Sequence, residues 1–214
     1  MWFDQSRTNR NWALGRRELA RVDPVMKKII ARVGPCTLAP RRDYFVVLCK
    51  SIYTQQISTR IATILFTRFR GQFPQKRPTP QRVLELLDGR HADEETIRRV
   101  GLSRQKKKYL IDLAQHFVDG RIPTRSFARM TDDQIIESLT RVNGIGRWTA
   151  EMFLIFVLNR PDVWPVDDLG LAEAVKVAYD LPVRPRPKEL MPVGERFRPH
   201  RTLATWYFWR SLSG

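Results

Sequence analysis

A short glycine motif, Gly144-Ile145-Gly146, constrains the fold of this chain more than any other feature of the sequence. It separates an amphipathic run that ends near Val142 from an apolar run over residues 148–158, and this spacing leaves no room for a strand. Glycine adopts positive φ angles at little cost and lets another backbone approach closely. The amides that begin the second run have no acceptor within a helix, so they are exposed donors at its positive end. We therefore predict a helix, a tight turn in which both glycines take positive φ, and a second helix whose first amides can hold a phosphate.

The charge of the chain points to a polyanionic partner. Its 214 residues include 38 Lys+Arg against 22 Asp+Glu, a formal net charge of +16, and 43% of the residues are hydrophobic. A chain of this size and composition fits a soluble globular protein of one domain or two closely packed lobes. Unbalanced positive charge repels itself in a compact state unless a polyanion binds it, and nucleic acid is the leading candidate. A generally basic surface without such a partner is the alternative.

The sequence shows neither a metal-cluster pattern nor a targeting segment. Cys36 and Cys49 are too few to hold an iron–sulfur cluster or a disulfide framework, which fits a reducing compartment. The N-terminus has no apolar core of signal-peptide length, and no stretch approaches the ~18 apolar residues of a membrane span. We therefore expect a cytoplasmic protein without a membrane partner, located on the nucleoid of a bacterial-type cell.

Apolar residues recur at helical spacing along most of the chain, and no segment alternates as a strand does. Residues 71–80 are expected to form a loop, and residues 182–199 a proline-rich crossing without a helix. The expected helices cover residues 18–33, 42–53, 58–69, 82–87, 93–101, 103–118, 131–142, 148–158, 168–179 and 200–212. The predicted fold class is all-α.

Several helix starts are marked by capping residues. Pro24 restarts a helix as its first-turn residue, and Asp93 and Ser103 precede two others as N-caps. Thr131 with Gln134 three positions later makes a capping box. The polar, arginine-rich residues 1–17 are expected to form an N-terminal arm, and whether it packs on the body, residues 18–214, is left open.

Five motifs, in their order and spacing, resemble the helix-hairpin-helix DNA glycosylase superfamily, and most of all its 3-methyladenine DNA glycosylase II branch. They are SIYTQQIS, GLSRQKKKYLIDLA, VNGIGRWTA, VWPVDD and FRPHRTLATWYFW, and the match extends from residue 18 to residue 212. The resemblance implies a two-lobed helical helix-hairpin-helix fold, with the hairpin at residues 139–150 and the active-site cleft between the lobes. Larger members of the branch carry an additional N-terminal α/β domain, which this chain is expected to lack.

The resemblance implies one catalytic carboxylate and no covalent intermediate. Trp148 occupies the position at which bifunctional relatives have a lysine, and a tryptophan has no amine with which to form a Schiff base. Asp168 matches the catalytic aspartate of the family by its position after the hairpin. A carboxylate there stabilises the oxocarbenium-like sugar that develops as the N-glycosidic bond breaks. Because an Asp-Asp pair is also typical of a helix N-cap, we assign the cap to Asp167 and the chemistry to Asp168.

The expected substrate is an alkylated purine, because its positive charge activates the leaving group and favours stacking on aromatic rings. By resemblance Trp209 is the base-stacking residue, while Trp148 and Tyr53 are weaker candidates for the pocket wall. Met152 stands where some relatives have an aromatic residue, which leaves the range of substrates open. A place in the hydrophobic core is the alternative for each of these aromatic side chains.

The loop Gln55-Gln56-Ile57-Ser58 is implied as the segment that fills the gap when a base is rotated out of the duplex. An ordinary polar junction between two helices is the alternative. The basic run Lys106-Lys107-Lys108, with Arg104 before it, either contacts phosphates or is a solvated face.

The hairpin is the DNA anchor implied by the resemblance, and phosphate contacts of this kind position DNA without reading its sequence. Its expected contacts are the backbone amides of Gly144, Gly146 and Thr149, with Arg147 beside them. A structural Na+ or K+ ion is also implied, on the backbone carbonyls of Thr140, Val142 and Ile145.

The sequence therefore predicts a monomeric, monofunctional DNA glycosylase that excises alkylated purines, such as 3-methyladenine and 7-methylguanine, from double-stranded DNA in base excision repair. It uses no catalytic cofactor. Another glycosylase of the superfamily, acting on a deaminated or oxidised base with or without lyase activity, is one alternative. A non-catalytic helix-hairpin-helix DNA-binding protein is the other, and it explains the charge and the hairpin but not the position of Asp168.

Overall fold

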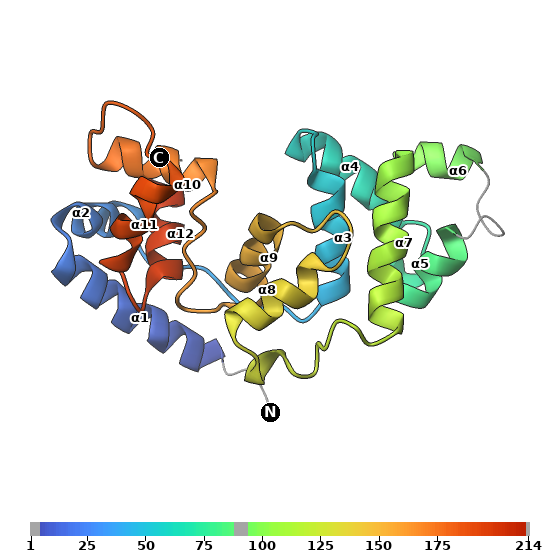
Figure 1. Ribbon diagram of the computed structural model, residues 1–214, viewed down its shortest axis with the longest axis horizontal. Helices are drawn as coiled ribbons and strands as arrows, with labels where there is room; N and C mark the ends of the chain where they lie inside the picture. The colour runs from blue at the N-terminus through green and yellow to red at the C-terminus, as the bar shows by residue number, and fades with distance from the viewer. Residues whose placement is uncertain (1–4, 88–93, 213–214) are drawn as a thin grey trace. The chain divides into compact units, whose positions relative to one another are not determined.

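A computed structural model describes residues 5–87 and 94–212, and this part of the chain consists of helices and connecting loops without a strand (Figure 1). The predicted all-α class is confirmed. The chain divides into two compact units, Met1–Arg41 with Glu151–Gly214, and Arg42–Ala150. Asp93, a predicted cap, and the first four residues of the arm lie outside the described residues. Within the described ranges, no helix is both long and apolar enough to span a bilayer.

The first unit is built around α12 (Arg201–Ser211), whose residues 202–208 are all buried. A helix enclosed on every side needs neighbours around its whole circumference. These neighbours are α1 (Gln5–Val22), α2 (Pro24–Val33) and α10 (Leu169–Ala178) (Figure 1). Trp164 and Phe197 pack on Phe208 of α12 as an aromatic cluster. The unit also contains the π-helical segment η3 (Leu154–Leu158) and α11 (Pro187–Glu195).

The N-terminal arm is helical from Gln5 onward, so the predicted boundary at residue 18 falls inside α1. Trp12 is buried and its indole N–H donates to the carbonyl of Leu38 at 3.1 Å, which holds the arm against the first unit. The predicted restart at Pro24 is confirmed, because the side chain of Asp23 caps α2 by accepting from the amide of Met26 at 2.7 Å.

The second unit is built around α7 (Arg104–Val118), which packs against α3 (Tyr44–Thr54) and α5 (Pro80–Leu87). α4 (Thr59–Arg70) packs on α3. The unit also contains the 3-10 segments η1 (Pro74–Lys76) and η2 (Phe127–Arg129), α6 (Glu94–Arg99) and α8 (Asp132–Thr140), and α9 (Arg147–Phe153) begins in it. The predicted cap at Ser103 and the Thr131–Gln134 capping box are both present.

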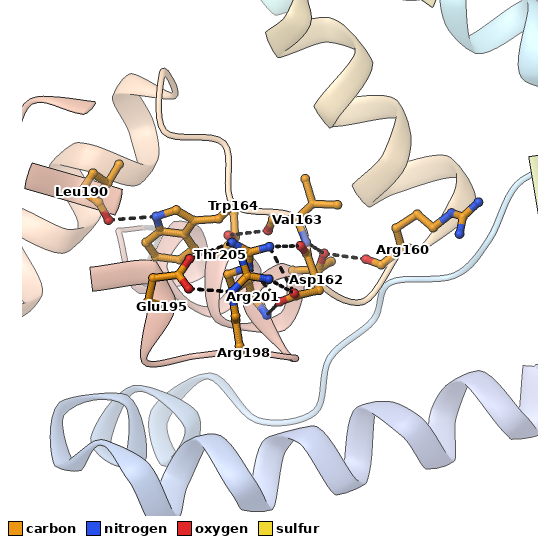
Figure 2. A network of polar contacts seen from close by, with 10 residues as sticks. Arg160, Asp162, Val163, Trp164, Leu190, Glu195, Arg198, Arg201 and Thr205 are labelled. Atoms are coloured by element: carbon orange, nitrogen blue, oxygen red, sulfur yellow. Dashed lines mark hydrogen bonds and ion pairs between the residues drawn. The ribbon is translucent and has the colours of Figure 1, made fainter. Parts of the chain in front are cut away.

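The segment between η3 and α10 is pinned to the start of α12. Arg201 and Arg198 converge on the carboxylate of Asp162, with Arg201 Nε 2.8 Å from Oδ1 and Arg198 Nη1 2.9 Å from Oδ2 (Figure 2). Thr202 forms hydrogen bonds with backbone groups of residues 160–163 through its own amide and hydroxyl. Charge-assisted bonds to a partly buried carboxylate are among the stronger polar contacts in proteins. This network therefore fixes the chain that leads to the predicted catalytic carboxylate.

Residues 182–199 contain the helix α11, where the sequence predicted a crossing without one. Pro187 occupies the first turn of the helix, where no backbone donor is required. The side chain of Glu189 accepts from the amide of Arg186 at 2.8 Å and caps the start. Leu190 is buried, and its carbonyl accepts from the indole of Trp164 at 3.0 Å. The density of prolines concealed this helix, which tertiary contacts stabilise.

Candidate functional site

Asp168 is the N-cap of α10 in the first unit. Its Oδ1 accepts hydrogen bonds from the backbone amide of Leu171 at 2.5 Å and from the indole Nε1 of Trp209 at 2.8 Å. The assignment of the cap to Asp167 was therefore wrong, because Asp167 is exposed and the following aspartate takes that position. The two N–H donors hold the carboxylate in one orientation.

Trp209 stacks on Phe156 beside this carboxylate. Their rings are 5.5 Å apart between centroids and inclined by 15°, while 40% of Phe156 is exposed to solvent. Phe156 was not among the predicted site residues, because it lies in an apolar run where nothing in the sequence distinguishes it from its core neighbours. The tertiary fold thus joins the predicted base-stacking tryptophan and the predicted catalytic carboxylate in one cluster, which we call the carboxylate–aromatic cluster (Phe156, Asp168, Trp209).

Gly170 keeps this cluster uncrowded. A Cβ atom at this position would lie 3.2 Å from Asp168 Oδ1 and 3.5 Å from the indole of Trp209. Contacts at 3.2 Å are tighter than ordinary van der Waals packing, so the absence of a side chain leaves room beside the carboxylate. The sequence carries a signal for this position, since the glycine directly follows the motif VDDL.

The hairpin in the second unit contains one constrained glycine rather than two. Gly144 has φ +85°, and a Cβ atom there would lie 2.3 Å from the ring of Tyr109. The φ angle of Gly146 is outside the left-handed region, and no atom lies within 4 Å of its would-be Cβ. The prediction of positive φ is therefore confirmed for Gly144 and wrong for Gly146. At Gly146, which is exposed, the missing side chain leaves the backbone open to an approaching group.

The other predicted residues of the hairpin differ in exposure. Arg147 is exposed, and 48% of Trp148 is exposed, whereas the side chain of Thr149 is buried, which leaves its predicted role to its amide. The carbonyl of Val142 accepts from the amide of Ile145 at 3.0 Å, so a cation would share this oxygen with a hydrogen bond. The cation on the carbonyls of residues 140, 142 and 145 stays a prediction.

The loop at residues 55–58 is tied at both ends. The side-chain amide of Gln55 donates to the carbonyl of Gly144 at 2.7 Å, and the hydroxyl of Ser58 caps α4 by accepting from the amide of Ile61 at 3.4 Å. Between them Gln56 is exposed with φ +59°, and the side chain of residue 57 is half-buried. The structure thus brings the predicted wedge loop and the predicted hairpin together through Gln55.

Three further predicted residues have positions that bear on their roles. Tyr53 is fully buried between Phe66 and Phe69, so its ring has no exposed face to line a pocket and this prediction is not supported. Met152 is half-buried on α9. Lys106 donates to the carbonyl of Tyr53 at 2.9 Å, and its partial burial lowers the pKa of its ammonium group. Lys106 therefore supports the end of α3 rather than standing on a solvated face.

Comparisons with known proteins identify the family of this chain and several similar proteins. The sequence profile of the HhH-GPD superfamily base excision DNA repair protein family matches residues 49–199. DNA-3-methyladenine glycosylase 1 of Schizosaccharomyces pombe is 34% identical over 202 residues, covering 90% of this chain and 84% of that protein. The structure of the Schizosaccharomyces pombe 3-methyladenine DNA glycosylase in complex with abasic DNA superimposes with a TM-score of 0.81 at 32% identity, covering 94% of this chain and 97% of that one. The structure of a DNA-3-methyladenine glycosidase from Bacillus halodurans superimposes with a TM-score of 0.79 at 29% identity, covering 92% of this chain and 88% of that one.

Proposed function

This chain belongs to the HhH-GPD superfamily of base excision DNA repair proteins, and on that basis we propose that it is a monofunctional DNA glycosylase for alkylated purines. The substrate class is that of 3-methyladenine and 7-methylguanine in double-stranded DNA. The similar proteins named above are 3-methyladenine glycosylases, and one of them was solved with abasic DNA, the product of base removal. Its partner is DNA, and its product is a free base together with an intact abasic site.

The observation that carries this proposal is the fixed carboxylate of Asp168. Two N–H donors on Oδ1 hold the group in place at the start of α10, before any substrate is present. When the N-glycosidic bond breaks, the base leaves with the bonding electrons and the sugar becomes an oxocarbenium-like cation. A carboxylate already oriented toward that charge stabilises the transition state more than the neutral sugar of the ground state. Water then adds to the sugar.

The aromatic part of the cluster accounts for the preference for alkylated purines. A purine methylated at N3 or N7 carries a positive charge, and such a cation gains roughly 0.5 to 2 kcal/mol on the face of an aromatic ring. The stacked pair of Trp209 and Phe156 offers such a surface in the same unit as the carboxylate. Because the charged base is also a good leaving group, this chemistry needs little help from a general acid.

The absence of strand cleavage follows from the residue at position 148. A bifunctional glycosylase needs a nucleophilic amine to form an imine with the sugar. The family resemblance puts Trp148, which has no amine, at the position that carries this nucleophile in bifunctional relatives. Hydrolysis by water is therefore the expected route, and the abasic site is left unbroken.

The hairpin and the charge of the chain account for DNA binding. The exposed backbone at Gly146 and the exposed Arg147 stand where a phosphate is expected, and a net charge of +16 favours a polyanion. We extend the proposal to a monomer that works on the chromosomal DNA of a bacterial-type cell.

Base release from methylated DNA tests the proposed function directly. Duplex DNA treated with a methylating agent is incubated with excess protein, and released 3-methyladenine and 7-methylguanine are separated by chromatography. The wild type is expected to release both bases. Asp168→Asn should lower the single-turnover rate at least about a hundredfold, which raises the barrier by roughly 2.7 kcal/mol. Asp167→Asn should release both bases at nearly the wild-type rate. The second variant removes the same charge at the adjacent, exposed position. Asp168→Asn should still bind DNA.

Two outcomes would replace this function by another. Covalent trapping of the wild type on damaged DNA by borohydride would place an amine nucleophile in the site and identify a lyase. Tight DNA binding without release of any base would identify a non-catalytic DNA-binding protein.

A further inference from the structure

One side of α7 contacts the hairpin and the end of α3, which leads into the loop at residues 55–58. The hairpin and this loop are the two segments that are expected to meet DNA. Lys106, Tyr109 and Asp112 are spaced by three residues, so they lie along one face of the helix. We call these three residues the α7 stripe. Each of them touches a different part of the hairpin or of the chain that enters the loop at residues 55–58.

Asp112 holds the first residue of the hairpin turn. Its Oδ2 accepts two hydrogen bonds from Asn143, from the backbone amide at 2.7 Å and from the side-chain Nδ2 at 2.9 Å. Its Oδ1 lies 3.4 Å from Nδ1 of His116, a buried residue one turn further along α7. Hydrogen bonds to an ionised acceptor are about twice as strong as bonds between neutral groups. The position of the turn thus depends on one carboxylate of another element.

Tyr109 and Gln55 fix the next residue of the turn. The ring of Tyr109 occupies the volume that a side chain at Gly144 would fill, and Gln55 donates to the carbonyl of the same glycine at 2.7 Å. A ring packed this closely leaves the glycine backbone no room to shift toward α7.

Lys106 supports the end of α3 that leads into the loop. Its ammonium group donates to the carbonyl of Tyr53, the penultimate residue of α3 and two residues before the loop. A cation at the C-terminal end of a helix also compensates the negative end of the helix dipole. The loop and the hairpin are therefore tied to the same helix, and to each other through Gln55.

We infer that the α7 stripe is a positioning device that sets the spacing between the hairpin and the 55–58 loop, so that both contact one DNA duplex at the same time. Asp112 is its central positioning residue, and Gln55 is a tether to the hairpin rather than a gap-filling side chain. The inference rests on the proposed function, since it takes the hairpin and the loop as DNA-contacting segments.

Removal of the Asp112 carboxylate distinguishes positioning from simple electrostatics, because the two predict changes of opposite sign. Deleting a negative charge from a DNA-binding surface should tighten binding if charge alone matters. The α7 stripe predicts the reverse, since the hairpin loses its support. Asp112→Ala is expected to weaken binding to a duplex with an abasic-site analogue by at least tenfold, about 1.4 kcal/mol. The rate of base release at saturating protein should change by less than about threefold, since the carboxylate–aromatic cluster is untouched.

Glu137→Ala is the matched control. Glu137 is an exposed carboxylate of α8 that pairs with the exposed Arg141 one turn later. Its removal changes the charge by the same amount as the removal of Asp112. This variant should bind the analogue as well as the wild type or better. Asp112→Asn keeps the shape of the side chain and one acceptor oxygen, so it should recover part of the lost affinity. If Asp112→Ala does not fold, Asp112→Asn takes its place in the test.

A double-mutant cycle tests whether Gln55 and Asp112 act on the same element. If both hold the hairpin, the loss of affinity in Gln55→Ala with Asp112→Ala should be clearly smaller than the combined losses of the single variants. Additive losses, or an Asp112→Ala variant that binds like Glu137→Ala, would overturn the inference. A wild-type protein that releases no base but still shows this coupling would instead refute the proposed glycosylase function and leave the α7 stripe in place.

Discussion

Gly144→Ala is expected to destabilise the protein by about 2–5 kcal/mol, and the structure divides this cost into two parts. The glycine has φ +85°, a left-handed conformation that costs a residue with a Cβ atom about 1–2 kcal/mol. The new methyl group would lie 2.3 Å from Cδ2 of Tyr109, so the ring must move, and overpacking of this kind costs roughly 1–3 kcal/mol. Urea unfolding followed by circular dichroism measures the sum.

Two further variants separate the two parts. Gly146→Ala meets no atom within 4 Å and needs no left-handed φ, so its free energy of unfolding should stay within about 0.5 kcal/mol of the wild type. In a Tyr109→Ala background the clash is gone, and Gly144→Ala should cost the backbone part alone, about 1–2 kcal/mol. The reasoning is refuted if the two glycine variants are equally stable, or if removing the ring leaves the cost of Gly144→Ala unchanged.

Three other predictions concern the chemistry and the DNA contact. Gly170→Ala should slow base release by about tenfold, because its Cβ would lie 3.2 Å from Oδ1 of Asp168. The stability of the helix should stay the same or increase. An unchanged single-turnover rate would contradict this interpretation of the glycine. Gly146→Val should weaken binding to an abasic-site analogue by at least tenfold, about 1.4 kcal/mol, by blocking the exposed backbone, and equal affinity in a folded variant would leave the hairpin as a structural turn only. Affinity for undamaged duplex should fall more than tenfold between roughly 50 and 200 mM salt, as counterion release requires, and a flat response in a binding titration would argue against a basic DNA groove.

The local signals in the sequence proved reliable where they rest on backbone chemistry. The restart at Pro24, the cap at Ser103 and the capping box at Thr131 depend on backbone groups within a few residues, and all are present. The stop after residue 158 is also confirmed, because Asn159 takes φ +51° and closes the π-helical segment. Local donors, acceptors and allowed φ angles are properties that a short stretch of sequence carries by itself.

The predictions that failed concern choices between neighbouring residues. The sequence does not show which of the adjacent residues Asp167 and Asp168 caps the helix. In the structure the indole N–H of Trp209 donates to the carboxylate of Asp168, which distinguishes it from Asp167. Gly144 and Gly146 look alike in the sequence, and the ring of Tyr109 identifies the first as the constrained one. In each case the deciding group comes from a helix distant in the chain.

By itself the sequence determined the helical class, the position of the hairpin, the carboxylate after it and the resemblance that connects them, because these depend on periodicity, local backbone chemistry and spacing along the chain. Only the tertiary structure decided what each side chain does. It made Phe156 the stacking partner of Trp209, buried Tyr53, built α11 on Trp164 and turned Gln55 toward the hairpin. The physical reason is that a side chain's role depends on the distance to partners that are far away in sequence, and folding alone brings those partners within contact.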